Sequence, residues 1–409
     1  MKRAIYLGTA FILVFLIASC TKDQINSDSS PLEKLSTDQS SSEYLSSDEQ
    51  ILEALNIEDK ETKRAYVPGN QSSVYSISNE TSANRVLVFN RNSDGTLTEA
   101  GSYHTGGTGT GEGLGNQGAL TLSDNKIFLF AVNPGSNEIS FFYIRGNGSL
   151  LLLDKIDSGG ELPVSITYHR GLIYVLNSGG TGNIAGFAVN HHAQLFELSD
   201  SRKDLSSDMA GGAQISFNGS GKALVVTEKA TNTITSYPVD AHGRPGMIHT
   251  FPSAGMTPFG FSFGRGNTFF VSEAAGGADN ASTVSSYFVS NWGKVSLLDG
   301  PFATNASAAC WVATTKNGLN LFVTNTGSND VSSLVATKMG ELDFGNDGNT
   351  TASDMSPIDA AVDHQSKYLY VLCGGDDSIV SYEIGEDGML TQIDTESGLP
   401  DRASGLVVR

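Results

Sequence analysis

The feature that most constrains this fold is an apolar run that ends at a polar, glycine-containing turn and is followed by renewed alternation. Leu321–Asn325 is the plainest copy, with Gly327 in the turn and alternation from Val331 onward. This pattern is typical of a strand, a tight turn and a second strand. The positions that end the first strand are 80, 133, 177, 228, 273, 325 and 373, which are spaced by 53, 44, 51, 45, 52 and 48 residues. Seven copies at this period predict an all-β fold, a seven-bladed β-propeller.

The seventh copy indicates the content of one blade. Ile358–Val362, Lys367–Leu372, Ile379–Ile384 and Met389–Ile393 are separated by turns, which predicts four-stranded antiparallel blades. The first copy has no clear inner strand before it, whereas Gly405–Val408 has the inner-strand pattern with nothing after it. We therefore expect the C-terminal strand to complete the first blade and close the ring, which leaves no open sheet edge.

The N-terminus has the pattern of an export signal. Lys2 and Arg3 precede an uncharged apolar run of 14 residues, which is shorter than the roughly 18–20 residues of a membrane-spanning helix. The run closes in Ile17-Ala-Ser-Cys20, which resembles the bacterial lipobox. That resemblance implies that residues 1–19 are a lipoprotein signal peptide and that Cys20 is the lipid anchor. An ordinary secreted protein is the alternative.

Residues 20–65 differ in composition from the rest of the chain. Ser, Asp, Glu, Gln and Asn dominate, so we predict a flexible acidic tether there and the propeller in residues 66–409. Ser47-Asp-Glu-Gln50 precedes Ile51 and has capping-box spacing, which predicts a short helix inside this segment.

Charge and cysteine content exclude some functions. Removal of residues 1–19 leaves 23 basic and 44 acidic side chains, a net charge of about −21, which argues against nucleic acid and anionic lipid surfaces as partners. Contact with the membrane is thus expected through the N-terminal lipid only. Cys310 and Cys373 could pair outside the cytoplasm, but we favour two buried thiols. We expect a monomer.

The repeats resemble a known family. The YVTN-like segment at Leu321–Val335, together with Gly106–Gly111, Gly115–Leu120, Ala131–Asn137 and Leu162–Ser165, is similar to the seven-bladed lactonase-type propellers, whose relatives are called 6-phosphogluconolactonases and 3-carboxymuconate cyclases. The resemblance covers residues 70–409 and implies the fold more specifically than the activity, because propellers carry unrelated functions.

The resemblance also implies where catalysis would take place. Enzymatic members are expected to use His, Arg and Glu near the channel, in a Gly-Pro-Arg-His stretch and a following Asn-Glu. Here Ala213 and Gln214 replace the arginine and the histidine, while Glu228 matches the glutamate. Glu228 is therefore the candidate catalytic residue, without the partner that general acid–base chemistry favours. A purely structural role at the strand end explains Glu228 equally well.

Polar residues at equivalent inner-strand positions predict a ligand site in the channel. Equivalent positions of four predicted inner strands are occupied by Ser165, Gln214, Trp311 and Asp359. Glu273 lies at the end of the first strand of a predicted hairpin. Amides, carboxylates and an aromatic ring would suit a neutral or cationic polar small molecule such as a sugar. The asparagines at the other hairpin ends equally suit the backbone groups of a tight turn.

Two loops invite a more specific interpretation. The glycines from Gly106 to Gly115 match no phosphate-binding pattern, so we expect an extended crossover into the second blade, with a lid at the channel mouth as the alternative. The stretch from Asp343 to Asp354 has the length of a calcium loop but Gly345 at its third position, so we predict no metal there. No cofactor is predicted.

These observations favour a lipid-anchored binding or scaffold protein of the bacterial cell envelope, which binds a polar small molecule or an envelope protein. We expect it at the outer membrane, facing the periplasm or the surface. The alternative is a lactonase or related cyclic-ester hydrolase that acts at the channel mouth, which rests on the family resemblance and on Glu228.

Overall fold

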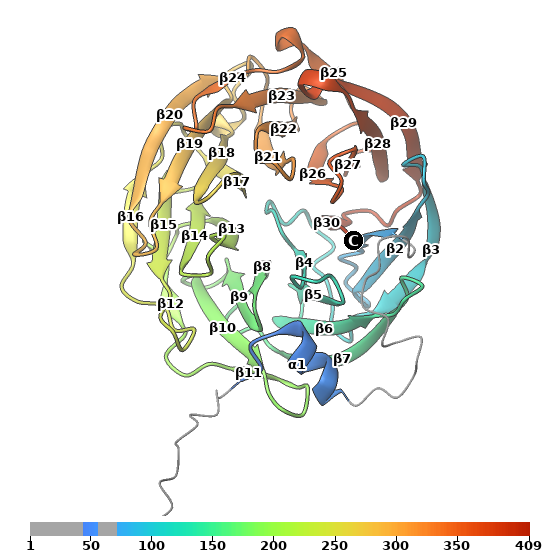
Figure 1. Ribbon diagram of the computed structural model, residues 1–409, viewed down its shortest axis with the longest axis vertical. Coiled ribbons are helices and arrows are strands. Elements are labelled where there is room, and N and C mark those ends of the chain that lie inside the picture. Colours follow the sequence, from blue (N-terminus) through green and yellow to red (C-terminus); the bar gives the residue numbers. More distant parts are fainter. Residues whose placement is uncertain (1–43, 56–71) are drawn as a thin grey trace, which may run out of the picture. The chain divides into compact units, whose positions relative to one another are not determined.

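The computed structural model describes residues 44–55 and 72–409. In this part of the chain, seven antiparallel sheets are arranged as blades around a central channel, as the repeat predicts (Figure 1). The predicted signal peptide, Cys20 and most of the predicted tether lie outside the described residues. No described helix is long and apolar enough to cross a membrane.

The first blade combines the two ends of the propeller. It contains β30 (Ser404–Val408), β1 (Ser72–Ile77), β2 (Arg85–Arg91) and β3 (Leu97–His104), in that order from the inside. Val74 of β1 pairs with Val408 of β30, and the Arg409 backbone N–H donates to the Ser73 carbonyl at 2.9 Å. The predicted closure by the C-terminal strand is confirmed.

Four blades are regular meanders of four strands. Blade 2 contains β4 (Leu120–Leu122), β5 (Phe128–Asn133), β6 (Glu138–Ile144) and β7 (Leu150–Asp157). Blade 4 contains β13 (Gly212–Phe217), β14 (Ala223–Glu228), β15 (Thr233–Pro238) and β16 (His249–Pro252). Blade 5 contains β17 (Pro258–Phe263), β18 (Thr268–Glu273), β19 (Thr283–Val289) and β20 (Val295–Ala303). Blade 7 contains β26 (Pro357–Val362), β27 (Tyr368–Cys373), β28 (Ser378–Ile384) and β29 (Leu390–Ser397).

Blades 3 and 6 have an interrupted outer strand. Blade 3 contains β8 (Pro163–His169), β9 (Leu172–Asn177) and β10 (Asn183–Val189), and both β11 (Leu195–Glu197) and β12 (Lys203–Asp204) pair with β10. Blade 6 contains β21 (Ala309–Thr314), β22 (Asn320–Asn325) and β23 (Asp330–Ala336), and both β24 (Leu342–Phe344) and β25 (Thr350–Ala352) pair with β23. Short 3-10 turns occur at η1 (Ala275–Gly277), η2 (Asn346–Gly348) and η3 (Glu386–Gly388). The proposed calcium-length loop thus forms β24, η2 and β25 at the rim.

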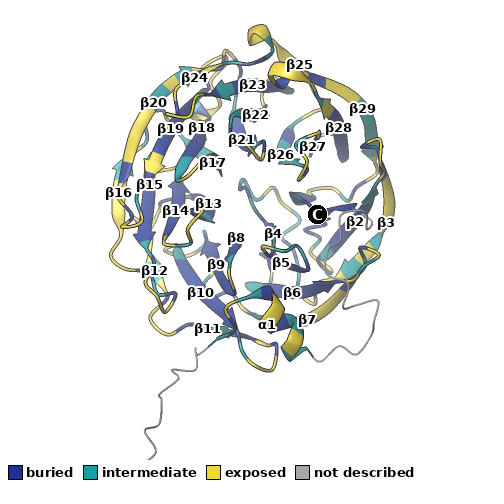
Figure 2. Cartoon of the chain, in the orientation of Figure 1, coloured by how far each residue is buried: buried dark blue, intermediate teal, exposed yellow. Residues whose placement is uncertain are grey.

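The core lies between neighbouring blades, because both faces of each sheet are covered by the next. Tyr174 and Leu176 of blade 3 share one apolar cluster with Ile215 and Val226 of blade 4. Figure 2 shows the second strands of the blades almost entirely buried and much of the outer strands and turns exposed, whereas inner strands such as β17 and β26 are only partly buried. Cys310 and Cys373 are buried free thiols, as expected.

The inner strands run in the same direction around the channel. Backbone N–H groups of Ile215 and Phe217 in β13 donate to the Ser165 and Thr167 hydroxyls in β8, at 3.1 and 3.3 Å, so the two strands are parallel and in step. The channel therefore has an upper mouth, where the inner strands begin, and a lower mouth, where they end.

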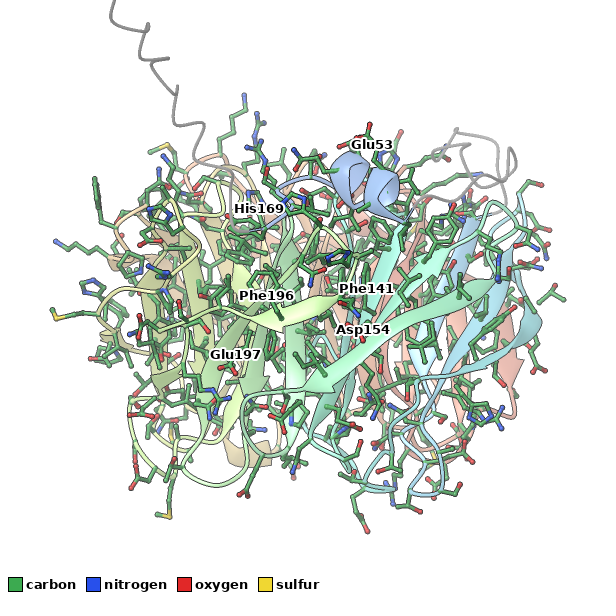
Figure 3. All side chains as sticks on the ribbon, turned by 90° about the horizontal axis from the view of Figure 1, so that it is seen from below. Glu53, Phe141, Asp154, His169, Phe196 and Glu197 are labelled. Atoms are coloured by element: carbon green, nitrogen blue, oxygen red, sulfur yellow. The ribbon has the colours of Figure 1, made fainter. Side chains whose placement is uncertain are left out.

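The predicted helix is present as α1 (Asp48–Ala54), with Ser47 as its N-cap. Ile51 is fully buried against the propeller, and the Asp48 carboxylate accepts from the Asn125 backbone at 2.9 Å and from the Tyr168 hydroxyl. Asn125 and Tyr168 lie at the ends of inner strands, so α1 covers the lower mouth side, where His169 also lies (Figure 3). This part of the predicted tether packs on the blades.

Candidate functional site

The channel is crossed by the segment that leads into β4, residues 113–118. The Gln117 side chain donates to the Val312 carbonyl at 2.9 Å and accepts from the Val312 N–H at 3.3 Å. On the opposite side of the channel, the Gln117 backbone N–H donates to Ala213 at 3.1 Å, and the Gly118 carbonyl accepts from Ile166 at 2.8 Å. Figure 1 shows this segment reaching into the middle of the ring. The glycine-rich loop is thus part of the expected extended crossover into the second blade, and the end of this crossover enters the channel.

Close packing explains why glycines surround this segment. A Cβ at Gly260 would lie 2.1 Å from the Gln117 Oε1 atom, which is too close for any side chain. Gly118 has a φ of 80°, a conformation that residues with a Cβ rarely adopt. The glycines therefore let the segment pass between inner strands.

A pocket of about 340 Å³ opens at the upper mouth beside this segment. This volume is in the range of small-molecule sites. Its walls come from the crossing segment, from blades 6 and 7 and from the residues before β30. The described lining residues are Gly113, Leu114, Gly115, Asn116, Trp311, Thr326, Ser356, Ile358, Gly374, Gly375, Arg402, Ala403 and Ser404.

Arg402 supplies the positive charge of this pocket. No described lining residue is a carboxylate or a histidine. The Arg402 side chain is half exposed, and its Nε lies 3.3 Å from Asp401 Oδ1. A guanidinium held in this way can bind a carboxylate through two parallel hydrogen bonds.

Trp311 forms the aromatic wall of the pocket. Its indole N–H donates to the Asn116 carbonyl, which holds the ring against the crossing segment. Phe259 meets Trp311 edge-on at 5.0 Å between centroids. Lys229 lies 4.7 Å above the Phe259 ring and donates to the Gly115 carbonyl, and burial lowers the pKa of this lysine. The wall is therefore rigid and backed by a second cation.

The predicted catalytic residue, Glu228, is buried within blade 4. Its carboxylate accepts from the Ser206 N–H, the Thr231 hydroxyl and the Thr235 hydroxyl, each at 3.0 Å, and from the Ser206 hydroxyl. Every lone-pair direction is thus occupied by a donor from its own blade or the preceding loop. The geometry gives Glu228 a structural role and does not bring it to the pocket.

Glu273, predicted to bind ligand, occupies the equivalent place in blade 5. It accepts from the Ser253, Thr283 and Ser285 hydroxyls and from the Tyr287 hydroxyl, at 2.5 to 3.0 Å. Like Glu228, it ties a hairpin end to the outer strands. Glu228 and Glu273 therefore have the same structural role in blades 4 and 5.

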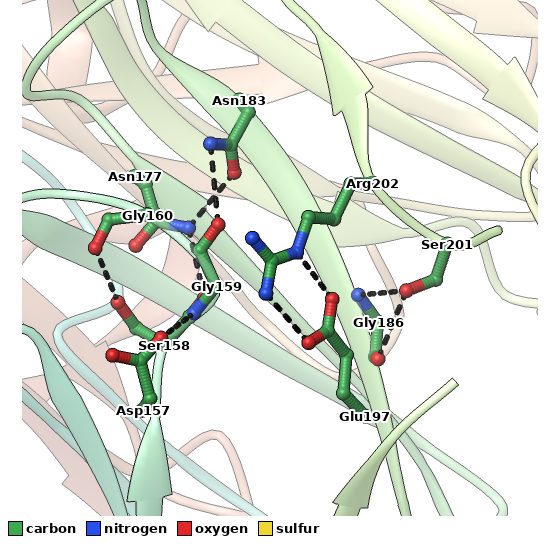
Figure 4. A network of polar contacts seen from close by, with 10 residues as sticks. All are labelled: Asp157, Ser158, Gly159, Gly160, Asn177, Asn183, Gly186, Glu197, Ser201 and Arg202. Atoms are coloured by element: carbon green, nitrogen blue, oxygen red, sulfur yellow. Dashed lines mark hydrogen bonds and ion pairs between the residues drawn. The ribbon is translucent and has the colours of Figure 1, made fainter. Parts of the chain in front are cut away.

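Asparagine fills the same place in other blades. The Asn177 amide donates to the Ser158 carbonyl at 2.9 Å and to the Asn183 side chain at 3.0 Å (Figure 4). Asn325 donates to Asp330 and Ser332 at 2.7 and 2.8 Å. The interpretation that these asparagines stabilise the turn therefore accounts for their positions.

The predicted inner-strand residues do line the channel, but the oxygen atoms of their side chains already accept hydrogen bonds from neighbouring backbone N–H groups. Ser165 accepts from Ile215, and the Gln214 Oε1 accepts from the Phe261 N–H at 2.6 Å, so both link adjacent blades. Only Trp311 of the predicted ligand residues lines the pocket.

Asp359 has the most perturbed carboxyl group in the channel. It is 2% exposed and accepts from the Ala360 N–H at 2.8 Å, with the Leu406 and Gly118 backbones as further donors. Burial raises the pKa of Asp359 to about 8, which these donors only partly offset. This carboxyl links the crossing segment to blade 7 and to the closing strand.

Sequence reasoning missed Arg402 and Asn116. Arg402 precedes the closing strand, and Asn116 precedes β4, so both lie outside the repeat that identified the other positions. The length of the connection before β4 is the signal that could have found Asn116.

The fold comparisons agree with this architecture. A candidate 6-phosphogluconolactonase from Bacteroides fragilis superposes with a TM-score of 0.68 at 17% identity, covering 84% of this chain and 99% of that chain. A candidate 6-phosphogluconolactonase from Bacteroides uniformis gives 0.70 at 15% identity, covering 83% and 99%. The periplasmic gluconolactonase of Pseudomonas aeruginosa gives 0.65 at 14% identity, covering 82% and 98%. No curated protein matches the sequence.

A family match agrees with the resemblance found in the repeats. Residues 46–201 match the family described as lactonase, 7-bladed beta-propeller. This stretch contains α1, the crossing segment and the first three blades apart from the closing strand and the last short strand of the third. The chain is therefore a seven-bladed β-propeller, and its residues 46–201 are similar to the lactonase family of such propellers.

Proposed function

We propose that this protein binds a small carboxylate-bearing polar molecule, of the sugar-acid class, in the pocket at the upper mouth. The observation that carries this proposal is the Arg402 guanidinium in a pocket of about 340 Å³ that also has the Trp311 wall. Arginine pairs with a planar carboxylate, and an aromatic ring packs against the apolar face of a sugar.

Hydroxyl groups complete the complement to such a ligand. Thr326, Ser356 and Ser404 line the pocket, and each hydroxyl can donate to or accept from a sugar hydroxyl. The charge of the pocket favours an acid over the neutral or cationic molecule that the sequence led us to expect. An acidic ligand approaching a chain of net charge −19 is recognised by this local cation.

Lactone hydrolysis is the second candidate, and the family match at residues 46–201 favours it. A sugar acid is the product of hydrolysis of a sugar lactone, so a site for the product is consistent with this activity. The described lining residues, however, include no general base, and Glu228 is held by four donors inside blade 4. Binding is therefore the better-supported function.

The experiment compares ligand binding and hydrolysis in the same preparation. Calorimetric titration with gluconate and with a panel of sugar acids should give an affinity that falls about 10- to 100-fold in Arg402→Ala, the loss expected for a charge-assisted pair. Arg244→Ala is the matched control, because Arg244 is a partly exposed arginine that follows β15 of blade 4, donates to the Ser199 hydroxyl at 3.1 Å and does not line the pocket.

Hydrolysis of a lactone panel separates the two candidates. Turnover by the wild type that is lost in Arg402→Ala and kept in Glu228→Gln would assign a lactonase to the pocket. Turnover lost only in Glu228→Gln would restore Glu228 as the catalytic residue. Equal affinity of the wild type and Arg402→Ala for every acid would contradict the binding proposal.

The location of the protein belongs to the same proposal. We place it in the bacterial envelope, attached through a lipid on Cys20, as the lipobox-like Ile17–Cys20 predicts. Cys20→Ser should move the protein from a washed membrane fraction to the soluble fraction, with Cys310→Ser as the control for loss of a thiol. Retention of Cys20→Ser in the membrane fraction would refute lipid anchoring through this residue.

A further inference from the structure

The lower mouth of the channel is basic, in contrast to the chain as a whole. The sequence has 25 Lys and Arg against 44 Asp and Glu, yet the end of the inner strand, or the turn that follows it, carries a Lys or Arg in all seven blades. These residues are Arg409, Lys126, Arg170, Lys222, Arg265, Lys316 and Lys367. Because the inner strands are parallel, these turns surround one mouth.

Two of these cations are fixed by backbone contacts at the closing strand. Lys126 Nζ donates to the Val408 carbonyl at 2.9 Å, which uses one of its three donors. Arg409 is only 2% exposed, and its Nε and Nη1 donate to the carbonyls of Lys126 and Arg145 at 3.1 and 2.9 Å.

A second pair comes from blades 6 and 7. Lys316 Nζ lies 3.2 Å from His364 Nε2, and both side chains are exposed. Burial and the charges of Lys316 and Lys126 lower the pKa of His364. Lys126 belongs to blade 2 and His364 to blade 7, so side chains from blades that are not neighbours interact electrostatically at this mouth.

The nearby carboxylates do not balance these cations. Asp363 uses its Oδ1 for the backbone N–H groups of Lys367 and Tyr368, at 2.6 and 2.9 Å. Asp124 accepts from the Arg170 N–H at 3.2 Å. Burial, opposed by Asp363 and assisted by the charges of Arg409, Lys316 and Arg91, lowers the pKa of Lys126 to about 8. Asp48 and Glu49 of α1 lie beside Asp124 and Arg170, so the positive charge is in excess around Lys126, Lys316 and His364.

We propose that the lower mouth is a binding site for a multivalent oxyanion, a phosphoryl or sulfate group held against Lys126, Lys316 and His364. Ammonium groups and an imidazole N–H that converge from three blades match the tetrahedral oxygens of such a group. This site is at the opposite end of the channel from the pocket with Arg402, so it does not depend on the proposed function. The oxyanion belongs to a free ester or to a lipid headgroup, which present the same chemistry.

The test is a titration of the full chain with inorganic pyrophosphate and with sulfate. The wild type should bind pyrophosphate, and the double variant Lys316→Glu/His364→Ala should bind it at least about 10-fold more weakly, because it removes one cation and one imidazole donor and adds a carboxylate. Both positions are exposed, so the variant should fold. Lys338→Glu, an exposed lysine next to the outer turn of blade 6, is the control of similar charge change and should bind within about 2-fold of the wild type.

Sulfate gives a second readout, because its charge is constant between about pH 6 and pH 9. Lys126 and His364 gain protons as the pH falls, so sulfate affinity should rise toward low pH. Besides burial, Arg409, Lys316 and Arg91 lower the pKa of Lys126, Lys316 and Lys126 lower the pKa of His364, and Asp363 raises both. A structural role alone would leave affinity independent of pH.

Vesicles distinguish the source of the anion. Pyrophosphate binding that is lost in the double variant, without flotation on phosphatidylglycerol vesicles, assigns a free ester. Flotation of the wild type on phosphatidylglycerol but not on phosphatidylcholine, lost in the double variant, assigns a headgroup. Binding of pyrophosphate and vesicles that is the same in the wild type, the double variant and Lys338→Glu would overturn the proposal, as would the absence of any binding by the wild type.

Discussion

Leu406→Ala should destabilise the whole propeller, because Leu406 belongs to the strand that closes the ring. It is 5% exposed and lies in the apolar cluster shared by blades 1 and 7, together with Val408 at 6%. Truncation of a buried leucine to alanine costs about 2–5 kcal/mol, since a cavity remains. Deletion of Ser404–Arg409 removes both aliphatic side chains, at about 1.5–3 kcal/mol each, and the β1–β30 pairing. The total is a large part of the roughly 5–15 kcal/mol of a typical domain.

Urea unfolding followed by tryptophan fluorescence measures the point variant. Leu297→Ala is the matched control: Leu297 lies in the outer strand β20 and is 41% exposed, so its truncation should change the free energy of unfolding by about 0.5 kcal/mol or less. The six-residue deletion should aggregate or lose soluble yield, because it opens the ring and leaves unpaired strand edges. If Leu406→Ala and Leu297→Ala unfold at the same urea concentration, the closing strand does not contribute to the core.

Three further predictions concern the lower side of the propeller and the channel. Asp359→Asn should flatten the dependence of the free energy of unfolding on pH. Burial raises the pKa of Asp359 to about 8, so the folded chain keeps a proton that the unfolded chain loses above about pH 4. The stability of the wild type should therefore fall as the pH rises from about 4 to about 8, by at most about 1.4 kcal/mol per pH unit. Urea titrations at several pH values measure this, and parallel curves for the two proteins would contradict it. Ile51→Ala should lower the free energy of unfolding by about 2–5 kcal/mol, because Ile51 is fully buried. Glu53→Ala is the exposed control and should lower it by less than about 0.5 kcal/mol. Equal effects of the two substitutions would show that α1 does not pack on the blades in solution. Gln117→Ala removes both bonds to Val312 and should speed amide hydrogen exchange in residues 113–118 by about 10-fold, and unchanged exchange would refute the role of this side chain.

The fold could be predicted because it depends on a pattern that the sequence repeats. Each blade needs the same alternation and the same turn, so the strands of blade 7 were placed within a few residues of β26 to β29. The closing strand was found by the same means, since Gly405–Val408 has the inner-strand pattern with no strands following it. Hydrophobic alternation is a local property, and it determines blades directly.

The candidate site was harder to predict, because side-chain direction is not a property of the repeat. Glu228 and Glu273 end strands that lead toward the upper mouth, yet both carboxylates turn into their own blades, where hydroxyl groups from the outer strands meet them. Some of the donors are distant in sequence: Ser206 lies 22 residues before Glu228. A burial preference that arises from distant donors cannot be read from the strand end alone.

The pocket arises where the chain departs from its repeat. The connection between β3 and β4 is longer than the other described connections that lead into an inner strand, and it contains the segment of residues 113–118 that crosses the channel. The other wall, with Arg402, comes from the connection to the closing strand, the second place where the repeat is interrupted. A symmetric ring of seven equal blades would offer a ligand seven equal surfaces and no preferred orientation. The interruption fills one level of the channel, links Asp359 to Gly118, and leaves a cation beside an aromatic wall on one side only. The same repeat that keeps the blades alike thus makes its two irregular connections the places where binding chemistry is expected, which is why substitutions there should change ligand binding with little effect on the blades.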